Sequence, residues 1–111
     1  MPEMPLTSNL EETIRLEGTC ADWLTKCVQA LEKGRFSRIC ADPESLIIDA
    51  DYRGMTVDGS IRLSLTPERD QAVIEIHIIA AVDNVCAFFS PPLERILRAF
   101  KSRLPIRHAK L

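Results

Sequence analysis

Apolar and polar residues alternate over residues 11–18 of the chain. Ile14 and Leu16 fall on one side of this segment, and Thr13, Arg15 and Glu17 fall on the other. A period of two is typical of a strand with one buried face. We therefore expect the first strand here.

An amphipathic helix is expected directly after this strand. Thr19 and Asp22 have the spacing of a capping box, with Asp in place of the usual Glu, and Gly34 supplies a C-terminal stop. Between them, apolar residues recur at helical spacing, at Cys20, Trp23, Leu24, Cys27, Val28 and Leu31. The pattern predicts a helix of about four turns.

The segment from residue 35 to residue 80 predicts four antiparallel strands, near 35–41, 46–57, 60–66 and 71–80. Three turn signals separate them, at residues 42–45, at Asp58-Gly59 and at residues 67–70. The Asp58-Gly59 pair favours a two-residue hairpin turn, which predicts that Arg53 lies opposite Ser64.

The other two turns extend this register across the sheet. They place Arg62 opposite Glu75, Ser60 opposite His77, and Arg38 opposite Asp49. The residues expected to face the core on the two middle strands are Ile48, Ala50, Tyr52, Ile61, Leu63 and Leu65.

A mostly apolar connection follows, and Ser90-Pro91 then opens a second helix that Pro105 closes. Its apolar stripe consists of Leu93, Ile96, Leu97, Phe100 and Leu104. The expected fold class is α+β, with a five-stranded, mostly antiparallel sheet and both helices packed on one face. We expect a flexible N-terminal segment over residues 1–10, a single domain over 11–104 and a basic tail over 105–111.

Charge is distributed unevenly along the 111 residues, whose formal net charge is −2. Residues 1–94 hold all 16 acidic and 8 basic residues, whereas residues 95–111 hold six basic residues and no acid. Cations near a helix C-terminus complement its dipole, and a site for an anion or an acidic partner is the alternative interpretation.

The four cysteines do not predict a disulfide or a zinc site. Cys20 and Cys27 lie about 10.5 Å apart along the predicted helix axis, too far for either bond. Clustered glycines and the common nucleophile or metal motifs are missing from the sequence, so we expect no cofactor and no metal. Without a signal peptide or an apolar run long enough for a membrane span, we expect a soluble, cytoplasmic protein.

The most enzyme-like grouping lies on the exposed face of the predicted sheet, where Ser60 and His77 could act as nucleophile and base. The alternative is a solvated face with cross-strand ion pairs between Arg62 and Glu75 and between Arg38 and Asp49. Charges on this face cancel, which argues against a nucleic-acid partner.

The element order, with Gly18 before the first helix and Ser90-Pro91 before the second, resembles a group of small uncharacterised bacterial domains. It is similar to a TBP-like layout and to a shortened helix-grip arrangement of START and Bet v 1 proteins, over about residues 11–104. Helix-grip proteins often hold apolar ligands between the C-terminal helix and the sheet. The resemblance implies a ligand site at Tyr52, Leu63, Ile76, Ile96 and Phe100.

Residues 82–89 are expected to form a contact surface, most simply of a homodimer, through Val82, Val85, Phe88 and Phe89. The alternative is that Phe88 and Phe89 close the open end of the core. Three functions remain open at this point: a non-catalytic binding or protein-interaction module, a carrier of a small apolar ligand, and an unrecognised enzyme.

Overall fold

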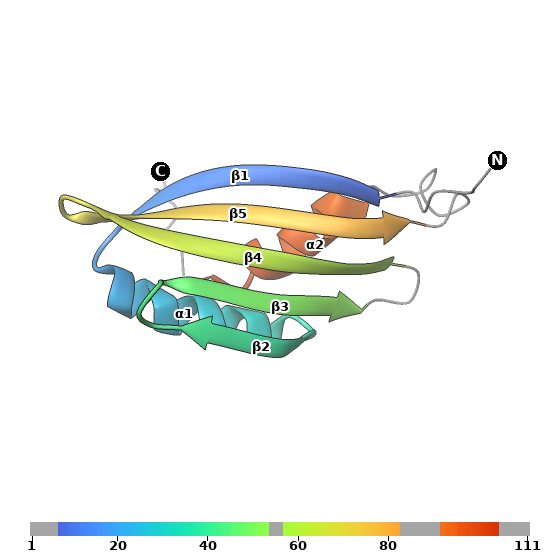
Figure 1. Ribbon diagram of the computed structural model, residues 1–111, viewed down its shortest axis with the longest axis horizontal. Coiled ribbons are helices and arrows are strands. Elements are labelled where there is room, and N and C mark those ends of the chain that lie inside the picture. Colours follow the sequence, from blue (N-terminus) through green and yellow to red (C-terminus); the bar gives the residue numbers. More distant parts are fainter. Residues whose placement is uncertain (1–6, 54–56, 83–91, 105–111) are drawn as a thin grey trace.

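The apolar face of a five-stranded sheet and the apolar sides of two helices enclose the core (Figure 1). The computed structural model describes residues 7–53, 57–82 and 92–104. The elements follow in the order β1 (Thr7–Glu17), α1 (Cys20–Lys33), β2 (Phe36–Asp42), β3 (Ile47–Arg53), β4 (Val57–Glu68), β5 (Gln71–Val82) and α2 (Pro92–Lys101).

The strands lie in the order β1-β5-β4-β3-β2, and all four pairings are antiparallel. The first strand therefore lies beside the last one, and β1 and β2 form the two edges of the sheet. This arrangement confirms the expected α+β class and the five-stranded sheet. β1 begins at Thr7 rather than at Glu11, so four residues expected to precede the domain belong to the sheet.

Both helices cover the same face of the sheet, as predicted (Figure 1). Alternation of burial along the strands shows which face this is. The six residues predicted to point inward from β3 and β4 are all buried. Trp23 of α1 and Ile76 of β5 are also buried, whereas Leu97 of α2 is only partly covered.

The start of α1 is held by contacts that the sequence indicated in part. The Thr19 hydroxyl accepts a hydrogen bond from the Asp22 backbone N–H at 3.1 Å, which confirms the predicted cap. The Trp23 indole N–H donates to the Glu17 carbonyl at 2.8 Å, and the Gly18 N–H donates to the Asp70 carbonyl at 3.0 Å. Gly18 has a φ of 124°, a conformation that favours glycine.

The register between β3 and β4 differs from the prediction. Asp58 and Gly59 are not a turn: both lie in β4, where they pair with Arg53 and Tyr52. Arg53 therefore lies opposite Asp58 rather than Ser64. The physical reason is that Gly59 supplies space under α2 instead of a positive φ in a turn.

The two other predicted registers are each wrong by two residues. The turn between β4 and β5 is at Arg69-Asp70, so Arg62 pairs with His77, and Glu75 pairs with Ser64. Between β2 and β3, Asp49 pairs with Cys40 rather than with Arg38. This shift is already present beside the turn, where Asp42 pairs with Ile47, and beyond a bulge between Ser37 and Cys40, where Arg38 has a φ of 52°, it falls to one residue.

Candidate functional site

The five residues expected to bind a ligand lie in the core between the sheet and the two helices. Tyr52, Leu63, Ile76, Ile96 and Phe100 all belong to the core, with exposed fractions between 0 and 8%. Leu63 and Ile76 are directly opposite each other on β4 and β5. The ring of Tyr52 packs against that of Phe36, with centroids 5.2 Å apart.

Two glycines allow α2 to approach the sheet and α1 closely. A Cβ at Gly59 would lie 2.8 Å from the Ile96 Cδ1 atom and 2.6 Å from the Ile79 carbonyl oxygen. A Cβ at Gly34 would lie 2.8 Å from the carbonyl oxygen of Ala99. Ile96 and Ala99 of α2 therefore rest on positions that have no side chain.

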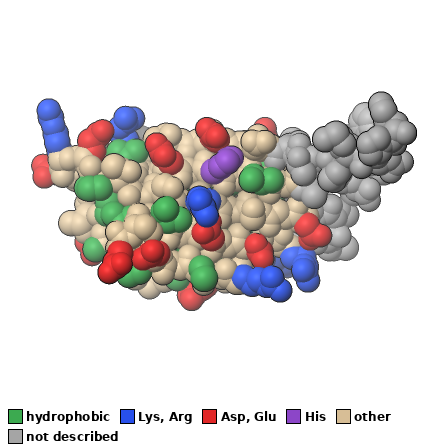
Figure 2. All heavy atoms as spheres, in the orientation of Figure 1, with side chains coloured by type: hydrophobic (Ala, Val, Ile, Leu, Met, Phe, Trp, Pro, Cys, Tyr) green, Lys and Arg blue, Asp and Glu red, His purple; other side chains and the backbone are tan. Residues whose placement is uncertain are grey.

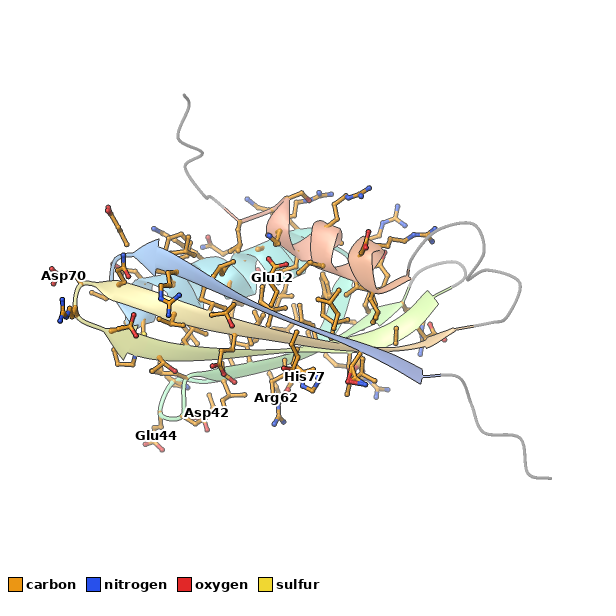
Figure 3. All side chains as sticks on the ribbon, turned by 90° about the horizontal axis from the view of Figure 1, so that it is seen from above. Glu12, Asp42, Glu44, Arg62, Asp70 and His77 are labelled. Carbon is orange, nitrogen blue, oxygen red and sulfur yellow. The ribbon has the colours of Figure 1, made fainter. Side chains whose placement is uncertain are left out.

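A polar contact joins α2 to the first strand. The Lys101 ammonium near the end of α2 forms an ion pair with Glu12 of β1. Figure 3 shows Glu12 on the side of the sheet that carries the helices, whereas Arg62 and His77 point away from them. Among the described residues, no polar or charged residue is buried in the core.

The core thiols are not suited to nucleophilic chemistry. Burial of Cys27 raises the pKa of its thiol from 9.0 to about 12, and burial also raises the pKa of Cys20. A thiol must ionise to act as a strong nucleophile. At neutral pH both side chains are therefore protonated and behave as small apolar groups.

A charged row crosses the opposite face of the sheet, where Figure 2 shows acidic and basic side chains interspersed. One residue from each strand contributes, in the order Glu11, His77, Arg62, Asp49 and Cys40. Arg62 donates two hydrogen bonds to the Asp49 carboxylate, at 2.7 and 3.2 Å, and these raise the pKa of Arg62. The His77 Nε2 atom lies 3.7 Å from a Glu11 carboxylate oxygen.

This row does not provide the proposed nucleophile and base. Ser60 lies opposite Ile79 rather than His77, so the predicted pairing of Ser60 with His77 is wrong. The row is bordered by two shallow hollows of about 240 and 330 Å³, which share Arg62 and His77 in their linings. Both guanidinium hydrogen bonds of Arg62 are directed to Asp49, which supports the alternative of a solvated face with ion pairs.

The contact surface expected over residues 82–89 falls almost entirely outside the part of the chain that the structure describes. Val85, Phe88 and Phe89 lie outside the described residues, and only the backbone of Val82, at the end of β5, is described. Within residues 7–53, 57–82 and 92–104, no helix is long and apolar enough to cross a membrane. The same residues contain no group of three or more His, Cys, Asp or Glu side chains that could hold a metal ion.

Sequence reasoning missed Gly59 and Glu12 as parts of the helix-to-sheet region. A glycine within an otherwise regular strand pattern is a signal for close approach of another backbone or side chain. Glu12 interrupts the inward-facing side of β1 between Leu10 and Ile14, and a charge at such a position indicates a partner of opposite charge.

No protein-family model matches the chain, and no curated protein sequence matches it significantly. Solved structures do match. Norcoclaurine synthase from Thalictrum flavum, in complex with dopamine and hydroxybenzaldehyde, is similar with a TM-score of 0.62 over 90% of this chain and 85% of that one, at 12% identity. The chain has a helix-grip-like fold.

Two further structures agree with this fold. A truncated norcoclaurine synthase from the same organism has a TM-score of 0.61 and 13% identity, covering 94% of this chain and 95% of that one. CalU16 from Micromonospora echinospora has a TM-score of 0.51 and 12% identity, covering 87% and 88%. At such low sequence identities, the similarity to these structures concerns the fold alone.

Proposed function

We propose that the chain is a non-catalytic binding domain that holds a small apolar molecule between α2 and the sheet. The observation that carries this proposal is the predominantly apolar character of the core beside α2. Leu63, Ile76, Ile96 and Phe100 contribute only hydrocarbon, and Tyr52 adds the one hydroxyl group of the five. Such a lining favours an uncharged ligand, because a buried charge without a partner is costly.

The fold supports this location. One of the similar structures, norcoclaurine synthase, is in complex with two small aromatic molecules, dopamine and hydroxybenzaldehyde. The two buried thiols of α1 are protonated at neutral pH, so they do not supply a nucleophile to a ligand in the core. Binding without chemistry is therefore the function that these residues favour.

Ligand entry requires α2 to move or its side chains to rearrange. Ile96 and Phe100 have no exposed surface, so a ligand would have to take space that these side chains now fill. α2 spans only ten residues and is fastened to β1 by the ion pair of Lys101 with Glu12. Because α2 packs on the sheet through side chains, it can shift without breaking the hydrogen bonds that join the strands.

A fluorescence titration with the uncharged apolar probe N-phenyl-1-naphthylamine tests the proposal. We expect saturable binding, with a blue-shifted emission and a raised thermal midpoint, because a ligand that binds the native state stabilises it. Ile96→Ala enlarges the region and should change the dissociation constant at least several-fold. Ile79→Ala, the same substitution on the opposite face, is the matched control and should leave it unchanged.

Both variants are compared well below their thermal midpoints, so that loss of folding does not imitate loss of binding. Failure of the probe to saturate would count against the proposal. A dissociation constant that responds to Ile79→Ala but not to Ile96→Ala would place binding on the exposed face and would also contradict it.

A further inference from the structure

The two edges of the sheet are built differently. β2 has seven residues, and a bulge interrupts its pairing between Ser37 and Cys40. β1 has eleven residues, and its pairing with β5 runs from Thr7 to Glu17 without a shift. Bulges protect sheet edges from pairing with another chain, and so do lysine and proline, neither of which occurs in β1. β1 is therefore the edge without a bulge, a lysine or a proline, and its one inward-pointing charge, Glu12, is already paired with Lys101.

The apolar side of β1 is also incompletely covered. Leu10, Ile14 and Leu16 point toward the helices, but all three are only partly buried. Among the described residues, β1 pairs with β5 alone, and its outer edge has no partner strand (Figure 1). An additional strand at this edge would satisfy its outward N–H and C=O groups and would cover more of these three side chains.

We propose that the partner of β1 is the β1 strand of a second copy of the chain. Antiparallel pairing about a two-fold axis perpendicular to the sheet would join the two sheets of five strands into one of ten. It would keep the helices of both copies on the same side. This interface is separate from residues 82–89 and from the region under α2.

The charges of β1 select one register. Three symmetric registers overlap nine or more residues, and they are centred on Glu11, Glu12 or Thr13. A centre at either glutamate places that glutamate directly opposite its own copy, and like charges in this arrangement are destabilising. The register centred on Thr13 has no such pair.

The Thr13 register pairs opposite charges on the exposed face and leucines on the helix side. On the exposed face, Glu11 of each copy lies opposite Arg15 of the other, which forms two ion pairs. On the helix side, Leu10 of each copy lies opposite Leu16 of the other, and Glu12, whose charge is paired with Lys101 of its own chain, lies opposite Ile14. Thr13 lies opposite itself at the centre, a pairing that also favours strand association.

Arg15 can form this contact and still keep its hydrogen bond to Glu68 of its own chain. It donates a hydrogen bond through Nε to Glu68 at 3.3 Å and remains largely exposed. In the dimer its guanidinium group would lie between Glu68 of its own chain and Glu11 of the second copy. The planar guanidinium has further N–H donors for the second carboxylate.

Light scattering coupled to size exclusion tests the interface. We expect the wild-type chain of 12.5 kDa to elute with a mass of about 25 kDa, twice that of one chain. Arg15→Glu and Glu11→Arg each place like charges opposite each other twice, and each variant alone should have the mass of a monomer. An equal mixture of the two should return to the mass of a dimer, because opposite charges then meet at both pairs.

Arg38→Glu makes the same charge change on the other edge strand and should leave the dimer intact. The register is checked with Thr13→Cys in a Cys40→Ser background, which should form a disulfide between copies under oxidation. Asn9→Cys, which would lie opposite Glu17, should not. A wild-type monomer from micromolar to millimolar concentration would overturn the proposal, and so would a dimer that persists in both Arg15→Glu and Glu11→Arg.

Discussion

Gly59 shows how one missing side chain positions an element. A Cβ at this position would lie between 2.6 and 3.2 Å from atoms of Ile79, Ala80 and Ile96, and the Ile79 and Ala80 atoms belong to the backbone of the neighbouring strand. Backbone atoms cannot swing aside as the end of a flexible side chain can. The absence of a side chain at Gly59 is thus required for α2 to pack at its observed position.

Gly59→Ala is therefore expected to destabilise the protein by about 1–3 kcal/mol, the range for overpacked sites. The measurement is urea unfolding followed by circular dichroism. Ser60→Ala, next in the strand but on the exposed face, is the control and should stay within about 0.5 kcal/mol of wild type. A Gly59→Ala variant as stable as wild type would mean that α2 does not rest on this position.

Burial of the Cys27 thiol should lower the free energy of unfolding at alkaline pH. Its pKa is about 12 in the folded chain and 9.0 when unperturbed, so above pH 9.0 the unfolded chain releases a proton that the native state keeps. Stability is unaffected below this pH and falls as pH rises toward 12. At about pH 10.5 the loss from this one thiol amounts to about 2 kcal/mol.

Cys27→Ala should remove that part of the decline. The comparison is the change in unfolding free energy between about pH 8 and about pH 10.5, in wild type and variant. Cys40→Ala, at an exposed thiol, should decline as wild type does. Equal slopes for wild type and Cys27→Ala would show that the thiol is not buried.

At the scale of elements, the end of α1 uses two residues where one glycine often suffices. One residue allows close approach of a neighbouring helix, and the next takes the left-handed conformation that ends the helix. Gly34 caps the helix with a φ of −97°, and Arg35 after it takes the left-handed conformation with a φ of 70°. A left-handed residue after a helix is usually glycine. Here glycine occupies the preceding position because the Ala99 carbonyl of α2 approaches it.

Opposite effects are expected at these two neighbours. Arg35→Gly relieves the left-handed conformation and should raise stability by up to about 1 kcal/mol. Gly34→Ala should lower stability, since its Cβ would contact the carbonyl oxygens of Ala99 and Ala30. Thermal unfolding of both variants checks this, and the same sign for both would be inconsistent with the geometry described.

The strands show which features the sequence can predict. Alternation along β3 and β4 correctly predicted the buried face, because a side chain's face depends only on its odd or even position. The predicted register was wrong by six residues between β3 and β4 and by two between β4 and β5. Even shifts preserve the faces, which is why the core was predicted although the pairs were not.

The error has a tertiary cause. Asp58-Gly59 favours a hairpin turn when only local preferences are considered. Its true position in β4 depends on α2, which is more than thirty residues away in the sequence. The ligand-site residues could be predicted as core residues from their pattern. The packing of Ile96 against Gly59 and the ion pair of Lys101 with Glu12 could not be predicted, since both depend on where α2 packs on the sheet.

At the scale of the whole molecule, the two faces of the sheet have different characters. One face carries the helices and an apolar core, and the other carries the charged row from Glu11 to Cys40. Ile79 is 44% exposed on the charged face, whereas Ile76 and Ile96 are buried on the helix face. These three isoleucines therefore report separately on the two surfaces where a ligand could bind.

Methyl NMR of isoleucine-labelled protein, titrated with N-phenyl-1-naphthylamine, tests the binding proposal most directly. The account predicts that the δ1 methyl signals of Ile76 and Ile96 shift together and saturate with one probe per chain, while that of Ile79 stays in place. A saturating shift at Ile79 with Ile76 and Ile96 unmoved, or no saturating shift at any of the three, would contradict a ligand site between α2 and the sheet.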